Sequence, residues 1–215
     1  MKAAYFALLL CATALAQTES GGSTKADGAK PNLLDLSTMT AQAPDTFQVK
    51  FATTKGDFTV LVTRAWSPRG ADRFYNLVRA GFYTDAAFFR VVPGFMVQFG
   101  ISARPDVSVV WKSAKIQDEP VVQSNTRGRI SFAAAGPNTR TTQVFISYGD
   151  NSRLDAVFSP FGEVTQGMDV VDHIYSEYRE KPSQLHIQAE GKAYLDENFP
   201  MLDHIISATI VPASK

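Results

Sequence analysis

The chain has 215 residues, 45% of them hydrophobic, so it is long enough for one well-packed globular domain with additional sequence. Its 21 lysines and arginines balance its 21 aspartates and glutamates, so the chain lacks the net positive charge that would attract nucleic acid to its surface. We therefore expect no nucleic-acid partner.

Residues 1–16 have the layout of a secretory signal peptide. Met1 and Lys2 precede an apolar run from Ala3 to Leu15, which is too short to span a bilayer and ends in small residues. We expect cleavage near Ala16, a mature chain without a membrane span, and a location in the periplasm or outside the cell; a retained anchor or a buried helix is the alternative. Cys11 is the only cysteine, so the mature chain would have no thiol for a disulfide or a metal site.

Residues 17–44 are rich in Ser, Thr, Gly, Ala and Lys without a sustained period, which predicts a flexible linker. The short apolar group Leu33, Leu34 and Leu36 inside it offers an alternative, namely docking on the domain. We place the folded domain at residues 45–215.

The domain is predicted to open with a β-hairpin, because apolar and polar residues alternate from Phe47 to Phe51 and from Phe58 to Val62. A helix of about three turns is expected next. Ser67 and Pro68 supply its cap and first-turn proline, and Gly81 ends it.

Short apolar runs separated by turn residues predict antiparallel strands across residues 88–164. A second helix is expected where Met168, Val171, Ile174, Tyr175 and Tyr178 share one face. A short helix near residues 193–199 and a strand from Ile205 to Val211 follow. Two helices among many strands favour a closed β-barrel with a helix at each end, since closure removes exposed sheet edges; an open sandwich is the alternative.

Two segments carry the residues that bear on function: FFRVVPGFMVQ at residues 88–98 and ISFAAAGPNTRTTQVFI at residues 130–146. Taken alone, the first segment is equally well explained as core with one surface charge. Together the two segments resemble the signature of the cyclophilin family. The resemblance extends over residues 47–211 and includes Gly81-Phe82-Tyr83, Leu154-Asp155 and Phe161-Gly162-Glu163-Val164.

The resemblance implies a mainly β fold, a closed eight-stranded antiparallel barrel capped by two helices. It implies a peptidyl-prolyl cis/trans isomerase that accelerates rotation of X-Pro bonds in proline-containing peptides and unfolded proteins. We expect a bacterial, exported, monomeric enzyme without a cofactor or a metal. The histidines His173, His186 and His204 have no metal-ligand spacing.

The family's site residues map onto ten positions of this sequence. By resemblance Arg90 donates a hydrogen bond to the proline nitrogen when the amide is twisted, and Gln98 holds that arginine or the peptide. The other eight positions form the substrate-binding surface: Phe95, Met96, Ala133, Ala134, Gln143, Phe145, Leu154 and Phe158.

The sequence departs from the common eukaryotic pattern at three positions of the rim. Ala134 stands where asparagine is common, Arg153 where tryptophan is common and Phe158 where histidine is common. These changes put cyclosporin binding in doubt, but isomerase activity is still expected. The alternative function is a proline-recognising binding module or holdase with little turnover. A further hypothesis concerns residues 178–202, whose length suggests an accessory surface.

Overall fold

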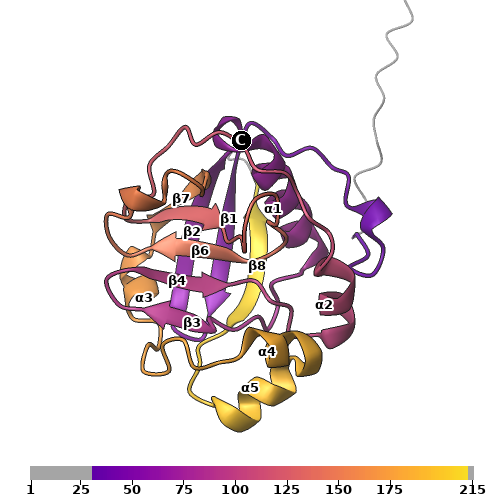
Figure 1. Ribbon diagram of the computed structural model, residues 1–215, viewed down its shortest axis with the longest axis vertical. Coiled ribbons are helices and arrows are strands. Elements are labelled where there is room, and N and C mark those ends of the chain that lie inside the picture. The colour runs from indigo at the N-terminus through magenta and orange to yellow at the C-terminus, as the bar shows by residue number, and fades with distance from the viewer. Residues whose placement is uncertain (1–30, 213–215) are drawn as a thin grey trace, which may run out of the picture.

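The computed structural model describes residues 31–212; the predicted signal peptide and residues 17–30 of the predicted linker lie outside this range. The described part of the chain forms one mainly antiparallel β-sheet with short helices around it (Figure 1). Its strands are β1 (Thr46–Thr53), β2 (Gly56–Thr63), β3 (Arg90–Val92), β4 (Met96–Phe99), β5 (Arg129–Phe132), β6 (Val144–Ser147), β7 (Pro160–Gln166) and β8 (Ile205–Val211).

The sheet has the strand order β3-β4-β6-β5-β7-β2-β1-β8 and is open between β3 and β8. The closed barrel predicted from sequence is therefore wrong, and the fold is an open half-barrel. An isolated bridge between Ala87 and His204 joins the segments that precede the two end strands. The free edge of β3 is occupied instead by a loop, because Val91 N donates to Arg179 O at 3.1 Å. This hydrogen bond pairs a backbone N–H on the edge of β3 that barrel closure would otherwise have to pair.

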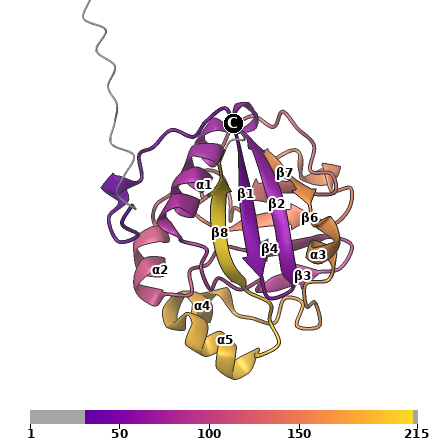
Figure 2. The same ribbon diagram turned by 180° about the vertical axis from the view of Figure 1, so that it is seen from behind.

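The two halves of the sheet fold over each other and enclose the core. Strands β3, β4, β6 and β7 cross in front of β1, β2 and β8, and Figure 2 shows the latter group from behind. Aromatic rings fill the space between the layers: Phe51 stacks on Phe58 at 4.7 Å and meets Phe99 edge-on at 5.8 Å. The period-2 alternation of β1 places Phe47, Val49 and Phe51 in this core, as the sequence predicted.

Helix α1 (Pro68–Ala80) confirms the first predicted helix, and Gly81 ends it with a φ of 74°. Ser67 stands at the predicted N-cap position, but its side chain accepts no hydrogen bond from the helix. The Glu119 carboxylate takes this place, accepting from Arg69 N at 2.7 Å and from Gly70 N at 3.2 Å. A remote carboxylate is thus the cap of α1.

The remaining helices correct the sequence-based prediction in two places. Helix α2 (Pro105–Trp111) lies within the stretch predicted to be strands only, although Pro105 at its first turn and buried Val107 and Trp111 are helical signals. The second predicted helix ends early: α3 spans only Met168–Asp172. The chain leaves the helix because Tyr175 N donates to Asp203 Oδ2 at 2.8 Å.

Residues 31–44 are packed on the domain, in contrast to the predicted flexible linker. Trp111 Nε1 donates to Leu33 O at 2.9 Å, and Asn76 both donates to Ala41 O and accepts from Ala41 N. Ala43 is buried in the core. The described end of this segment therefore belongs to the folded unit, but of the apolar group expected to dock only Leu33 packs on the core, and Leu34 and Leu36 are exposed.

Helices α4 (Gln184–Glu190) and α5 (Lys192–Asn198) lie together at one end of the molecule (Figure 1, bottom). The short helix α5 was predicted, whereas α4 was not. The two helices close a second, smaller core, whose buried members are Ala87, Phe89, Ile101, Ile187 and Leu195. Within residues 31–212, no helix has both the length and the apolar character that a bilayer crossing requires.

Candidate active site

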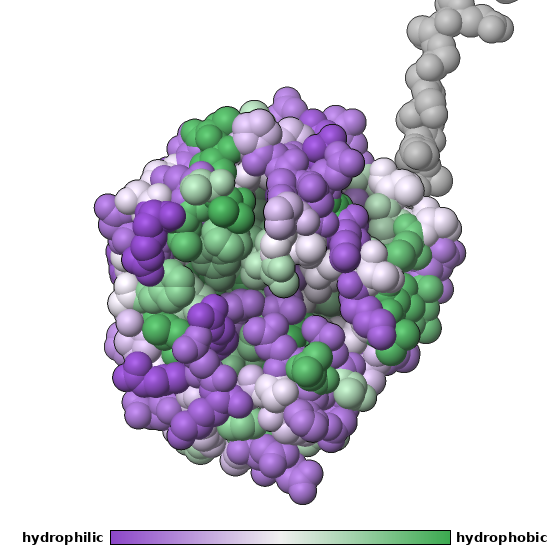
Figure 3. All heavy atoms as spheres, in the orientation of Figure 1, coloured by the Kyte–Doolittle hydropathy of each residue, from purple (hydrophilic) through white to green (hydrophobic). Residues whose placement is uncertain are grey.

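One cleft brings together all ten residues that the sequence predicted for the site. Its volume is about 580 Å³, which is within the range of small-ligand and peptide pockets. Figure 3 shows the face of Figure 1 hollowed near its middle, with hydrophobic atoms inside the hollow and hydrophilic atoms around it. The predicted residues that line the cleft are Arg90, Phe95, Met96, Gln98, Ala133, Ala134, Gln143, Phe145, Leu154 and Phe158.

A chain of side-chain hydrogen bonds crosses the cleft. Arg90 on β3 pairs in register with Gln98 on β4, and Arg90 Nη1 donates to Gln98 Oε1 at 3.1 Å. Gln98 Nε2 in turn donates to Gln143 Oε1 at 2.8 Å. Strand pairing therefore sets the position of the guanidinium, and the two amides set its orientation.

The floor and one wall of the cleft are apolar. Met96 and Phe145 are buried, and alternation along β4 places Met96 on the same face as Gln98 while Val97 and Phe99 enter the core. Phe145 meets Phe158 edge-on at 5.5 Å. The arrangement provides a hollow in which a small apolar ring could be removed from water.

The wall that carries Leu154 and Phe158 is tied to the Pro-Gly turn. Phe95 O accepts from Tyr148 N at 2.9 Å and from Asn151 Nδ2 at 2.8 Å. Leu154 ends the short 3-10 helix Ser152–Leu154, and its carbonyl accepts from Phe158 N at 3.0 Å. One carbonyl thus anchors the start of this loop beside Phe95 and links the two apolar walls.

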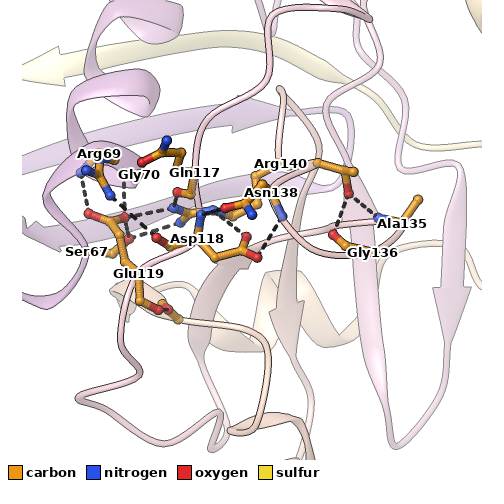
Figure 4. A network of polar contacts seen from close by, with 12 residues as sticks. Ser67, Arg69, Gly70, Gln117, Asp118, Glu119, Ala135, Gly136, Asn138 and Arg140 are labelled. Atoms are coloured by element: carbon orange, nitrogen blue, oxygen red, sulfur yellow. Dashed lines mark hydrogen bonds and ion pairs between the residues drawn. The ribbon is translucent and has the colours of Figure 1, made fainter.

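The opposite wall, residues 133–141, rests on a buried ion pair (Figure 4). Arg140 Nη2 lies 3.0 Å from Glu119 Oε2, and the side chains are only 3% and 6% exposed. Asp118 and Asn138 hydrogen-bond reciprocally: Asp118 N donates to Asn138 Oδ1 at 2.8 Å, and Asn138 N donates to Asp118 Oδ2 at 2.7 Å. Arg140 also donates to Gln117 O. This network fastens the wall to the N-terminus of α1.

The hydrogen bonds around Glu119 control its charge. Burial alone would raise the pKa of the Glu119 carboxyl, but hydrogen bonds from Ser67 Oγ, Arg69 N and Arg140 outweigh burial and leave the pKa below its ordinary value. Glu119 is therefore ionised at neutral pH and remains paired with Arg140.

Seven further residues line the cleft that the sequence did not indicate as site residues. Three of them lie inside the motif-bearing segment 130–146, whereas those on α4 and in the loop after α2 lie in no motif, and only the cap Ser183 and Gly191 marked α4 in the sequence. A side-chain amide pair one helical turn apart, Gln184 and Gln188, faces the cleft from α4. The other five are Lys112, Lys115, Ala135, Thr139 and Thr141.

A sequence profile of the family described as cyclophilin type peptidyl-prolyl cis-trans isomerase matches residues 48–191, more than half of the 215 residues. The chain belongs to this family. The matched range contains all ten residues of the cleft that were predicted from the sequence.

Curated relatives carry names from the same family. Peptidyl-prolyl cis-trans isomerase-like 3 of Neurospora crassa is 35% identical over 99 residues, which are 42% of this chain and 59% of that protein. Peptidyl-prolyl cis-trans isomerase-like 1 of Aspergillus niger is 32% identical over 93 residues, or 42% of this chain and 57% of that protein. The chain thus spans less than two thirds of the length of these relatives. They are fungal, and do not support the bacterial origin that we expected.

Solved structures show the same fold. The cyclophilin type peptidyl-prolyl cis-trans isomerase of Cryptosporidium parvum has a TM-score of 0.62 at 21% identity and covers 79% of this chain and 99% of its own. A structure of that protein in the presence of the dipeptide Ala-Pro has a TM-score of 0.60 at 22% identity and covers 77% and 99% of the two chains. At these identities the likeness establishes the architecture alone.

Proposed function

We propose that this chain is a peptidyl-prolyl cis/trans isomerase whose substrates are proline-containing peptides and unfolded proteins. The observation that carries the proposal is Arg90, which lies beside an apolar hollow and is held by Gln98. Family membership supports the same activity. The fold of a relative whose structure was determined with Ala-Pro is consistent with a proline-containing ligand.

The chemistry requires no nucleophile, because rotation about an X-Pro bond makes and breaks no bond. The barrier is about 18–20 kcal/mol and reflects amide resonance. In the twisted amide the proline nitrogen regains its lone pair, and a guanidinium N–H from Arg90 can donate to it. Phe95, Met96, Phe145 and Leu154 hold the proline ring by burial, so the site would bind the twisted amide more tightly than either planar form.

A protease-coupled assay on an Ala-Pro peptide tests the proposal. Wild-type protein should accelerate isomerisation, and Arg90→Ala should lower kcat/KM by about 100-fold or more, as expected when one fixed donor to a transition state is removed. Arg127→Ala is the matched control, because Arg127 pairs with Asp172 at 2.6 Å and does not line the cleft. Its activity should equal that of wild type.

The same assay separates catalysis from simple recognition. If the wild-type protein binds the peptide but gives no acceleration over the uncatalysed rate, the protein is a proline-recognising binding module or holdase. Equal turnover by wild type and Arg90→Ala would exclude the catalytic role given to this residue.

We also propose that the protein is exported and acts as a monomer. Export is supported by the signal-like residues 1–16, and a monomer by the fact that one chain supplies every residue named for the cleft. N-terminal sequencing of the mature protein should find a start near residue 17, and its size in solution should be that of one chain. An intact N-terminus or a larger assembly would overturn the respective proposal.

A further inference from the structure

A second side chain contacts Arg90 from outside the motif-bearing segments. Glu180 lies in the chain between α3 and α4, 90 residues from Arg90. Its Oε1 accepts from Arg90 Nε at 2.6 Å and lies 2.5 Å from Arg90 Nη2. Glu180 itself does not line the cleft.

The contacts divide the five N–H groups of the guanidinium in a definite way. Glu180 engages Nε and Nη2 along one edge, and Gln98 takes one N–H of Nη1. One N–H therefore remains on Nη1, and Nη2, which lies in ion-pair contact with Glu180, keeps N–H groups that are in no hydrogen bond to Glu180 or Gln98. A guanidinium that is bound on two sides in this way presents its remaining donors in a single orientation.

The backbone around Glu180 is anchored independently of Arg90. Val91 N donates to Arg179 O at 3.1 Å, so the residue after Arg90 binds the residue before Glu180. Arg179 adopts a φ of 50°, a conformation that costs energy for a residue with a side chain and that turns the loop at this point. Tyr178 packs edge-on against Phe199 at 5.1 Å. These contacts fix the backbone of this segment beside Arg90, so that the Glu180 side chain starts within reach of the guanidinium.

We propose that Glu180 is a positioning residue for Arg90, acting through hydrogen-bond geometry rather than through its charge. The inference rests on the proposed isomerase function. The hydrogen bond from Arg90 Nε and the ion-pair contact from Nη2 end on one oxygen atom, Oε1, and a neutral carbonyl oxygen in the same place could still accept the hydrogen bond from Nε. The side chains are 32% and 57% exposed, and water screens the attraction between such charges.

The test compares Glu180→Ala with Glu180→Gln in the Ala-Pro assay. Glu180→Ala should lower kcat by about three- to tenfold, the cost of ordering one freed side chain, with KM changed less than the rate. Glu180→Gln retains an acceptor oxygen and should recover most of this loss. Glu177→Ala is the matched control, because Glu177 is also exposed, lies in the same segment and does not line the cleft.

Three results would overturn the inference. If Glu180→Ala keeps the wild-type kcat, Glu180 has no role. If Glu180→Ala is faster than wild type, the carboxylate masks the guanidinium. If Glu180→Gln is as slow as Glu180→Ala, the charge of Glu180 matters.

A second readout is independent of turnover, namely hydrogen exchange of the Arg90 Nε–H signal by NMR. Exchange should be faster in Glu180→Ala than in wild type; equal exchange contradicts the inference even if wild type proves inactive, a result that would refute the proposed function separately.

Discussion

At the scale of single residues, the site depends on amides that orient one cation. Gln98 is 6% exposed and lies between two partners: its oxygen faces Arg90 and its nitrogen faces Gln143. The guanidinium can only donate, so the Gln98 oxygen must face it, and the Gln143 oxygen restrains the Gln98 amide in this orientation by accepting from its nitrogen. Gln143 thus acts on Arg90 through Gln98.

Replacing Gln143 by leucine should weaken catalysis without unfolding the protein. Gln143→Leu removes the acceptor for Gln98 Nε2. A lost hydrogen bond of this kind is worth about 1 kcal/mol, so kcat/KM should fall by about three- to tenfold in the Ala-Pro assay. Gln166→Leu, an exposed glutamine on β7 outside the cleft, should behave as wild type. Equal rates for both variants would show that Gln98 needs no such partner.

At the scale of elements, α4 and α5 form a unit with its own core. Gly191 joins them with a φ of 66° and lies so close to Ala103 that an added Cβ would be 2.2 Å from the Ala103 carbonyl oxygen. Lys192 N donates to the same carbonyl at 2.9 Å. Ile187 and Leu195 provide the apolar contacts, so the pair of helices is docked firmly beside the cleft that Gln184 and Gln188 line.

Truncation of this small core should loosen α4 and α5 before the sheet. Leu195 is buried, and Leu195→Ala should cost about 2–3 kcal/mol of local stability. Amide hydrogen exchange should then accelerate across both helices while the amides of β1 and β2 keep their protection. Leu185→Ala is the matched control on α4, because Leu185 is 79% exposed. This substitution should change neither the local stability nor the exchange of the helix amides. Uniform acceleration over the whole chain would argue against a separate unit.

At the scale of the whole molecule, the Arg140–Glu119 pair connects parts that are distant in sequence. It joins the cap of α1 to the wall of the cleft at residues 133–141. Because the pKa of Glu119 lies below its ordinary value of 4.5, the folded state binds fewer protons than the unfolded state at this group. Its contribution to stability is complete above the ordinary pKa and is lost as the pH falls through the lowered pKa.

Glu119→Gln should therefore change both stability and its pH dependence. At pH 7 the variant leaves the buried Arg140 with only the more distant Asp118 carboxylate, 3.6 Å from Nε, and the free energy of unfolding should fall by about 2–3 kcal/mol in urea titrations. Between pH 5 and pH 3 its stability should decline less steeply than that of wild type. An identical decline in the two proteins would show that Glu119 does not titrate with unfolding.

The sequence by itself determined the features that depend on neighbours along the chain. Alternating residues defined the hairpin of β1 and β2, Pro68 and Gly81 bounded α1, and two short motifs contained eleven of the seventeen residues that line the cleft. Pairing of β3, β4 and β6 brings these motifs together, because the motifs are the strands and turns themselves.

Only the tertiary structure decided the features that depend on packing between distant segments. These are the open edge between β3 and β8, the docking of residues 31–44, the capping of α1 by Glu119 and the approach of Glu180 to Arg90. The local sequence around each of these residues does not predict which distant residue it contacts. They follow from where the sheet bends and which loop covers its edge, and these are set by the burial of the whole core.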